Sequence, residues 1–469
     1  MSKNIAVVGG GPGGYAAAFY AADLGMQVTL IDEAVNPGGV CLYVGCIPSK
    51  ALLHVAALIN EAEHAKAWGV EFSKPNIDLN RLRDFKNSVV NRLTGGLGQL
   101  SKQRKVNYVR GRAGFVNSNT LNVRMAEGGE QKLSFDNIIL ATGSRPAMIP
   151  GVPPSQRIMD STAALELRDI PKTLLVIGGG YIGLELGTVY AALGTKVTVV
   201  EMLPQILTGA DRDLVNPLAK RLEKKFSSIM LNTKVVEMKE TADGIKVRLD
   251  GPNLAAPEQT FEKVLISVGR KPNTDIEGLD KTRVTKVQRG FIETDLQRRT
   301  KDPVIFAIGD IAGEPMLAHK ASHEGRVAVE AIAGKKTTFE PRAIPAVVFT
   351  DPEIAWCGLT ETEAQAKNIP VKVSRFPWAA SGRAVTLDRI EGVTKLVIDP
   401  ETERVLGLGI CGPNAGEMIS EGVLAVEMSA VVDDLSLTIH PHPTLSETIM
   451  EVAEAYHNVS THIYRPKRG

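Results

Sequence analysis

Residues 5–14 read I-A-V-V-G-G-G-P-G-G, an apolar strand that runs directly into a cluster of glycines. An alanine-rich helical stretch and a second apolar strand follow, and that strand ends at Asp32. Glycines spaced as Gly9, Gly11 and Gly14 let the backbone approach a pyrophosphate, which then lies at the positive end of the helix. The stretch therefore predicts a β-α-β dinucleotide-binding unit in which Asp32 accepts hydrogen bonds from a ribose.

A second unit follows the same plan at residues 174–183, which read L-L-V-I-G-G-G-Y-I-G. Its glycines are Gly178, Gly180 and Gly183, and the strand after its helix ends at Glu201. In both units the acid follows the first glycine by 23 residues, from position 9 to 32 and from 178 to 201. No lysine or arginine closely follows Glu201 to pair with a 2′-phosphate, and a carboxylate repels one, so this site is predicted to prefer NAD over NADP. Position alone does not say which site holds FAD.

Three further buried strands are predicted at residues 138–141, 264–268 and 304–308, and a glycine follows each closely. The proline-rich stretch 146–154 predicts a crossing between domains. Near residue 342 the pattern changes to shorter alternating strands and helices, which favour an α+β domain. The predicted fold class is α/β, with two Rossmann-like dinucleotide-binding domains and a C-terminal α+β domain.

Composition narrows the class of protein. A chain of 469 residues is long enough for two to four domains. Its formal net charge of +1 gives no electrostatic reason to expect nucleic acid or an anionic membrane as a partner. No uninterrupted apolar run reaches the roughly eighteen residues of a bilayer span. Because the chain passes from Met1 almost directly into a strand, no targeting segment is predicted, and a soluble cytoplasmic protein is expected.

Cysteine is scarce, and two of the four cysteines, Cys41 and Cys46, are close in sequence. A bridge between them would close a ring of about six residues, which stabilises a fold by only roughly 2 kcal/mol. Redox chemistry therefore explains the pair better than a structural role. Cys46 precedes an apolar-periodic helix at 51–59, whose N-terminus favours the thiolate that thiol-disulfide exchange requires. Lys50 gains nothing from that helix dipole, so it either serves another group or is a solvated surface lysine.

Residues 440–447 read H-P-H-P-T-L-S-E. The two histidines, His440 and His442, are restricted by the neighbouring prolines and have little backbone freedom, which suits a positioned base. Glu447, at the start of a predicted helix, is placed to hold one ring nitrogen and raise the basicity of the other. The same segment is also compatible with a simple turn that caps this helix.

Two further motifs have more than one interpretation. Asp310 ends a buried strand, where it either accepts hydrogen bonds from a flavin's ribityl chain or caps a helix. His319 and His323 have the i, i+4 spacing of a metal pair, but neither a CxxC nor an HExxH motif accompanies them. No metal site is predicted.

Taken together, the motifs resemble the pyridine nucleotide-disulfide oxidoreductases, and within that family the dihydrolipoamide dehydrogenases. The resemblance covers essentially the whole chain, and its cysteine motif and H-P-T-L-S-E motif are each highly specific. It implies four domains. They are an FAD-binding domain at 1–149, an NAD-binding domain at 150–272, a central domain completing the FAD site at 273–341, and a dimerisation domain at 342–469.

The resemblance also implies an enzyme that oxidises a protein-bound dihydrolipoyl dithiol to the disulfide and reduces NAD to NADH. By it, Cys46 is the thiol that faces the flavin, and Cys41 is the interchange thiol that reacts with substrate. His442, oriented by Glu447, is the base, and it reaches the cysteines of the other subunit of a homodimer. The implied partner is a lipoyl-bearing protein of a 2-oxo acid dehydrogenase or glycine cleavage complex.

One FAD per chain is implied at the first nucleotide site and NAD at the second. Lys50 and Glu185 resemble the ion pair beside the flavin's N5. The residues expected to contact the cofactors are Gly9, Gly11, Gly14, Asp32, Gly39, Lys50, Ala113, Thr142, Gly143, Ser144, Gly178, Gly180, Gly183, Glu201, Val235, Gly269, Asp310, Met316 and Ala318.

The sequence departs from this family's pattern near the cysteines. Val40 stands where threonine is usual and Tyr43 where asparagine is usual, and both change hydrogen bonding near the pair. Pro441 replaces a more common alanine.

The rival activities are those of a reductase for another disulfide or for mercuric ion. Glutathione-type enzymes prefer NADP, which Glu201 disfavours, and residues 462–469 contain none of the extra cysteines of mercuric and large thioredoxin reductases. From another class, a flavin-binding interaction subunit would need neither the cysteines nor the base.

Overall fold

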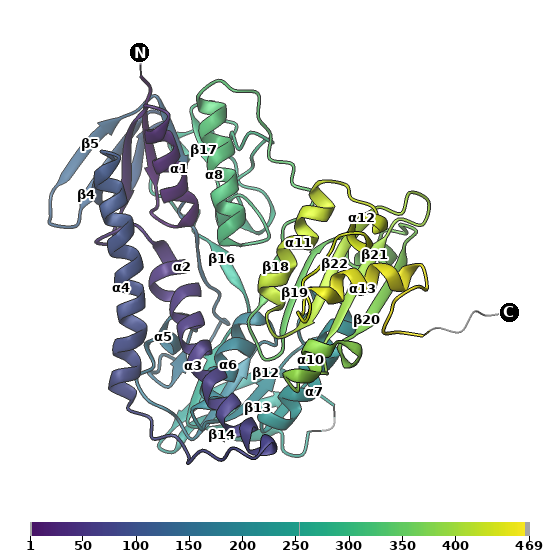
Figure 1. Ribbon diagram of the computed structural model, residues 1–469. Coiled ribbons are helices and arrows are strands. Elements are labelled where there is room, and N and C mark those ends of the chain that lie inside the picture. The colour runs from purple at the N-terminus through teal and green to yellow at the C-terminus, as the bar shows by residue number, and fades with distance from the viewer. Residues whose placement is uncertain (1, 253, 465–469) are drawn as a thin grey trace.

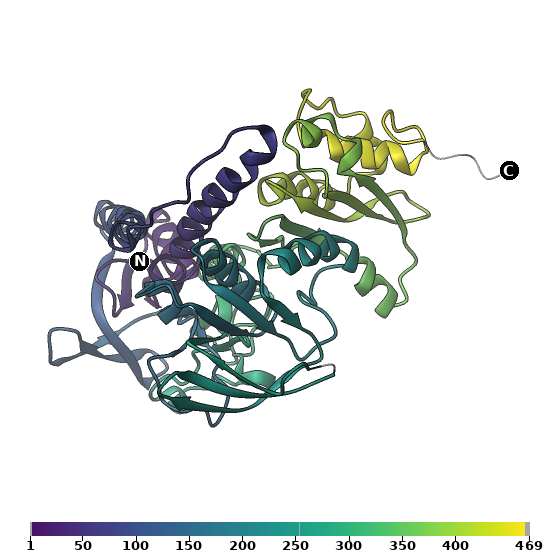
Figure 2. The same ribbon diagram turned by 90° about the horizontal axis from the view of Figure 1, so that it is seen from below.

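The computed structural model describes residues 2–252 and 254–464. Residues 465–469 lie outside the described residues. They are the end of the dimerisation domain expected at 342–469 and of the segment 462–469, which contains no cysteine. Figures 1 and 2 show three regions: the N-terminal sheet with its helices, the second Rossmann-like unit, and the C-terminal sheet.

The first region is built on the predicted β-α-β unit, β1 (Asn4–Val8), α1 (Pro12–Asp23) and β2 (Gln27–Asp32). Its sheet has the order β17-β6-β1-β2-β3-β4-β5. The first five strands of that order run parallel, and β4 and β5 extend the sheet as antiparallel hairpin strands. The added strands are β3 (Asn107–Asn117), β4 (Thr120–Met125), β5 (Glu130–Ser134), β6 (Asn137–Leu140) and β17 (Ile305–Ala307).

A late segment of the chain returns to this sheet. β17 pairs with β6, and α8 (Ala318–Ile332) packs beside α1 on one face, as Figure 1 shows. Residues 305–332, within the segment expected as a central domain, therefore complete the first sheet. This return brings the N-terminus of α8 to the nucleotide site formed by β1 and α1.

The second region has the parallel order β11-β10-β9-β15-β8. Beside it lies an antiparallel sheet, β12-β13-β14, which the sequence analysis did not predict. The elements are β8 (Ile158–Met159), α5 (Ser161–Glu166), β9 (Thr173–Ile177), α6 (Tyr181–Ala192), β10 (Lys196–Val200), α7 (Arg212–Lys225), β11 (Ser228–Met230), β12 (Lys234–Thr241), β13 (Gly244–Asp250), β14 (Glu258–Phe261) and β15 (Lys263–Ile266). A two-stranded ribbon of β7 (Ser144–Pro146) and β16 (Arg270–Pro272) joins this region to the first.

The C-terminal sheet is antiparallel throughout, in the order β18-β19-β22-β21-β20. α11 packs against β22 and β19, while α13 packs against β20 and β21. The elements are β18 (Ala346–Val348), β19 (Glu353–Gly358), α9 (Glu361–Ala366), β20 (Lys372–Pro377), α10 (Gly382–Thr386), β21 (Val393–Ile398), β22 (Val405–Gly412), α11 (Ala415–Glu427), α12 (Val432–Ser436) and α13 (Glu447–Tyr456).

The cysteine segment is more helical than expected. Cys41 lies inside a short helix, α2 (Gly39–Val44), and α3 (Cys46–His64) begins at the second cysteine. Of the described residues, Gly39–Trp68 is the one helical stretch long and apolar enough, by length and composition, to suit a membrane span. Gly45 interrupts it, and Leu52 and Leu53 belong to a buried core cluster, as expected for a core helix. α4 (Leu79–Gln103) packs beside α3.

Candidate active site

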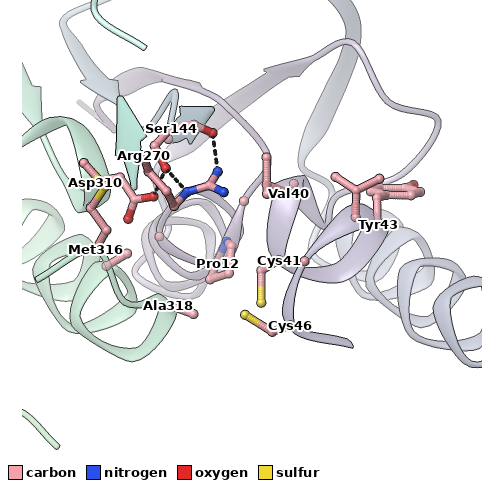
Figure 3. Close-up of a pocket in the computed structure, with 18 of the residues that line it drawn as sticks. Pro12, Val40, Cys41, Tyr43, Cys46, Ser144, Arg270, Asp310, Met316 and Ala318 are labelled. Carbon is pink, nitrogen blue, oxygen red and sulfur yellow. Dashed lines mark hydrogen bonds between the residues drawn. The ribbon is translucent and has the colours of Figure 1, made fainter. Parts of the chain in front are cut away.

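A cavity of about 460 Å³ lies between the first two regions and contains most of the predicted site (Figure 3). The expected residues that line it are Gly9, Gly11, Asp32, Gly39, Cys41, Cys46, Lys50, Thr142, Gly143, Ser144, Glu185, Asp310, Met316 and Ala318. Ala113, on β3, and Gly14, beneath the glycine turn, are not among its lining residues. The cavity therefore brings together residues from positions 9 to 318 of the chain.

The glycines of the first turn have the geometry that a pyrophosphate requires. Gly9 has a φ of +107°, and a Cβ there would lie 2.3 Å from the carbonyl oxygen of Ala141. A Cβ on Gly14 would lie 1.8 Å from the Gly9 carbonyl oxygen, so this position allows the helix to approach the strand. At Gly11 the nearest atom to such a Cβ is 3.9 Å away, which leaves space at the N-terminus of α1 for phosphate oxygens. These residues fit a dinucleotide.

The acids at the two strand ends are held in the same way. Asp32 Oδ2 accepts a hydrogen bond from the Gly10 N–H at 2.6 Å, and Glu201 Oε2 accepts one from the Gly179 N–H at 2.6 Å. The second oxygen of Glu201 accepts from the Leu203 N–H at 2.8 Å. Each carboxylate oxygen still has a lone pair available for a ribose hydroxyl. The two nucleotide sites thus present equivalent acceptors.

The second glycine turn repeats the geometry of the first. Gly178 has a φ of +106°, and a Cβ on Gly183 would lie 2.5 Å from the Gly178 carbonyl oxygen. A Cβ on Gly180 would meet no atom within 4 Å. Gly269 lies just beyond the end of β15, and Val235 lies on β12.

The sulfurs of Cys41 and Cys46, here called the cysteine pair, face each other in Figure 3. Both are free thiols. A hydrogen bond from Cys41 lowers the pKa of Cys46 to about 7, and the Lys50 ammonium acts in the same direction against burial. The same hydrogen bond and burial raise the pKa of Cys41. Of the two thiols, Cys46, at the first residue of α3, is therefore the one that ionises more readily.

Lys50 is not a solvated surface lysine. Its Nζ donates to Glu185 Oε2 at 2.7 Å, and Glu185 is only 3% exposed. The other oxygen of Glu185, Oε1, accepts the Phe349 N–H at 3.0 Å. Both members of the ion pair line the cavity, and the Lys50 ammonium is close enough to the cysteine pair to lower the pKa of Cys46.

A polar network lies across the cavity from the cysteines. Ser144 Oγ donates to Asp310, and Arg270 donates from Nε to Ser144 Oγ and from Nη2 to the Ser144 carbonyl oxygen, both at 2.7 Å (Figure 3). The sequence analysis did not single out Arg270, although Gly269 before it marks the end of a buried strand. Tyr181 also lines the cavity, and burial raises its pKa to about 12. No sequence signal marks Tyr181, because it occupies a variable position of the glycine motif.

His442 and Glu447 are in contact but are not among the residues that line the cavity. His442 Nδ1 lies 2.9 Å from Glu447 Oε1, and Glu447 Oε2 accepts the Thr444 N–H at 2.7 Å. Burial disfavours the Glu447 carboxylate, but the bonds from Thr444 and His442 more than offset it and lower its pKa. With Nδ1–H held by a carboxylate, Nε2 is free to accept a proton. The His442 side chain is 74% exposed, so this nitrogen is accessible from outside the chain.

The remaining motifs have local roles. His319 Nε2 bonds to the Pro345 carbonyl oxygen at 2.9 Å, and no cluster of three or more metal-ligating side chains occurs among residues 2–252 and 254–464. Tyr43 donates its hydroxyl to the Asn36 carbonyl oxygen at 3.0 Å, and its ring lies away from the two sulfurs (Figure 3). Val40 is 38% exposed and lines the cavity.

Comparison with known proteins gives matches over nearly the whole chain. Residues 3–325 match the family model described as pyridine nucleotide-disulphide oxidoreductase, and residues 344–453 match that family's dimerisation domain. A dihydrolipoyl dehydrogenase of Vibrio cholerae is 48% identical over 472 aligned residues, covering 100% of this chain and 99% of the relative. One from Geobacillus stearothermophilus is 47% identical, covering 99% and 98%. The crystal structure of LpdA from Mycobacterium tuberculosis matches with a TM-score of 0.89 and 26% identity, covering 97% and 99%.

Proposed function

This chain belongs to the pyridine nucleotide-disulphide oxidoreductase family, and on that premise we propose that it oxidises a protein-bound dihydrolipoyl dithiol to the disulfide and reduces NAD to NADH. The observation that carries this proposal is the cysteine pair, with one acidic thiol beside the Lys50–Glu185 ion pair in the main cavity. The dihydrolipoyl dehydrogenases that match the whole chain at 48% identity support the choice of substrate.

FAD occupies the first nucleotide site and NAD the second in this proposal. When bound, FAD would supply the two-electron chemistry that links the cysteine pair to the nicotinamide. Asp32 holds the FAD ribose, and Ser144 and Asp310 supply polar contacts along the cavity. Glu201 receives the NAD ribose and disfavours a 2′-phosphate.

The protein's own groups perform the thiol chemistry. His442 Nε2 takes a proton from one substrate thiol, and the thiolate formed attacks Cys41 of the oxidised pair. The bond between Cys41 and Cys46 breaks, and Cys46 leaves as a thiolate that the Lys50 ammonium stabilises. The second substrate thiol then attacks the substrate sulfur bound to Cys41, which releases Cys41 as a thiol and the substrate as a disulfide. Glu447 keeps the His442 ring in the required tautomer.

A second copy of the chain supplies the base, so the working unit is a homodimer. Exposed apolar side chains occur on and just after α11 and in the segment before His442, as a covered surface would require. They are Leu424 (63% exposed), Met428 (73%), Leu437 (80%) and Ile439 (94%).

Ile439→Asp is therefore expected to convert the dimer into monomers. The substitution places a charge in the interface twice, once per subunit, so association should weaken by about a hundredfold or more. Dihydrolipoamide turnover should fall in parallel. Sedimentation over a dilution series measures the change, with Val287→Asp, which places the same charge on an exposed β-branched residue elsewhere, as the control. A dimer of unchanged affinity would contradict the assigned interface.

A side-by-side assay tests the proposed reaction. Purified protein is supplied with dihydrolipoamide and oxidised NAD or NADP. In parallel it is supplied with glutathione disulfide or mercuric ion and the reduced form of either nucleotide. Oxidation of dihydrolipoamide with NAD should be the fastest reaction, because Glu201 disfavours NADP and the base deprotonates a dithiol. Faster turnover of glutathione disulfide or mercuric ion would favour the rival reductase, and a protein that binds no flavin would exclude both.

The partner in the cell is a lipoyl-bearing protein of a 2-oxo acid dehydrogenase or glycine cleavage complex. A cytoplasmic location is in keeping with the four cysteines, all of them free. With a net charge of +1, neither nucleic acid nor a membrane surface is part of the proposal.

A further inference from the structure

Lys50 is held by two groups from distant parts of the chain. Its Nζ lies 2.7 Å from Glu185 Oε2 and 4.6 Å from the centroid of the Phe349 ring. The Phe349 N–H donates to the other oxygen of Glu185 at 3.0 Å. Phe349 therefore contacts both members of the ion pair, the lysine through its ring and the glutamate through its backbone.

The three residues come from three different regions. Lys50 lies on α3, Glu185 on α6, and Phe349 directly follows β18 of the C-terminal sheet. A cation over an aromatic face is attracted electrostatically, and the attraction grows as water is excluded. Through the Phe349 side chain, the C-terminal region thus contacts the Lys50 ammonium, which lies beside the cysteine pair.

Phe349 is held firmly in this place. Its neighbours Val348 and Thr350 are 2% and 3% exposed. The ring packs against the core cluster that contains Leu52 of α3 and Leu184 of α6. A side chain fixed on both sides can in turn fix the flexible four-carbon stem of Lys50.

We propose that Phe349 is a positioning residue for the redox thiol: it holds the Lys50–Glu185 pair so that the ammonium stays beside Cys46. This inference rests on the proposed redox role of Cys46 and adds a residue that none of the sequence motifs contains. Without the ring, the ammonium is free to move toward water. The negative charge of the buried Glu185 carboxylate is then less well neutralised, and it disfavours the Cys46 thiolate.

Ionisable groups of four helices interact electrostatically with Cys46. They are Cys41 of α2, Lys50 of α3, Glu185 and Tyr181 of α6, and Tyr15 of α1. Lys50 lowers the pKa of Cys46 and Glu185 raises it. Displacement of Lys50 is therefore expected to raise the pKa of Cys46.

The test compares Phe349→Leu, which removes the ring but keeps apolar bulk and the N–H, with Phe349→Tyr, which keeps the ring. The thiolate's ultraviolet absorbance is titrated in the reduced holoenzyme, with the Cys46→Ser protein subtracted. The midpoint should rise by about half a unit in the leucine variant and stay in place in the tyrosine variant. No substrate is present, so the result can be read even if the proposed substrate is wrong.

Two further variants make the test specific. Lys50→Met should raise the midpoint on its own, and adding Phe349→Leu to it should produce no further shift, because both act through one ammonium. Tyr456→Leu removes another ring that contacts a lysine, 4.0 Å from Lys372 Nζ, and should leave the midpoint unchanged. An unshifted midpoint in Phe349→Leu, a full additional shift in the double variant, or an equal shift in Tyr456→Leu would each overturn the proposal.

Discussion

Replacing Cys46 with serine is expected to leave flavin bound but to abolish oxidation of dihydrolipoamide by NAD. A serine hydroxyl does not ionise near neutral pH, whereas hydrogen bonding from Cys41 lowers the pKa of Cys46 to about 7. Without that thiolate, electrons have no route from the substrate dithiol to the cofactor. The measurement is the rate of NADH formation, with flavin content taken from the visible spectrum of the same sample.

The other cysteines provide the controls. Cys41→Ser should be equally inactive but should keep a thiolate that titrates on Cys46, because a hydroxyl can still donate the hydrogen bond. Cys357 is buried, and burial raises its pKa to about 12, so Cys357→Ala should retain most of the activity. Near-normal lipoamide turnover in Cys46→Ser would refute the role assigned to this thiol.

The parts of the site that the sequence predicts well depend on local chain geometry. Gly9 and Gly178 both have a positive φ, as the tight turn after each strand requires, and each acid lies at the end of its second strand. The confirmed fold class also depends on these short patterns, since a strand, a glycine turn, a helix and a second strand together span about 30 residues. Such features need no knowledge of tertiary packing.

The parts that the sequence analysis missed depend on contacts between distant segments. Phe349 and Lys50 meet because three regions pack together, and neither residue carries a motif for the other. Arg270 reaches Ser144 only because β16 pairs with β7. Of the missed antiparallel strands, β12 has no buried residue and β14 has one, so their sequences carry little of the apolar pattern that predicts a strand.

His442→Gln is expected to slow dihydrolipoamide oxidation by about 10²-fold or more, which is typical for the loss of a general base. Glutamine can still bond to Glu447, but it has no nitrogen that accepts a proton. His440→Gln is the matched control in the same segment. Both His440 ring nitrogens are already engaged, with the Thr438 carbonyl oxygen and with Glu421, so its loss should matter much less. A change of less than about threefold in His442→Gln would mean that this histidine is structural rather than the base.

Co-expression of the two inactive chains tests where the base acts. If His442 serves the cysteine pair of the other subunit, a dimer of one Cys46→Ser chain and one His442→Gln chain has one complete site and one site that lacks both groups. Random pairing at equal amounts makes half of the dimers mixed, so activity should return to about a quarter of the wild-type value. Two different affinity tags allow the mixed dimer to be purified and assayed by itself. If the base instead served its own chain, the mixed dimer would hold no complete site and would be as inactive as either parent.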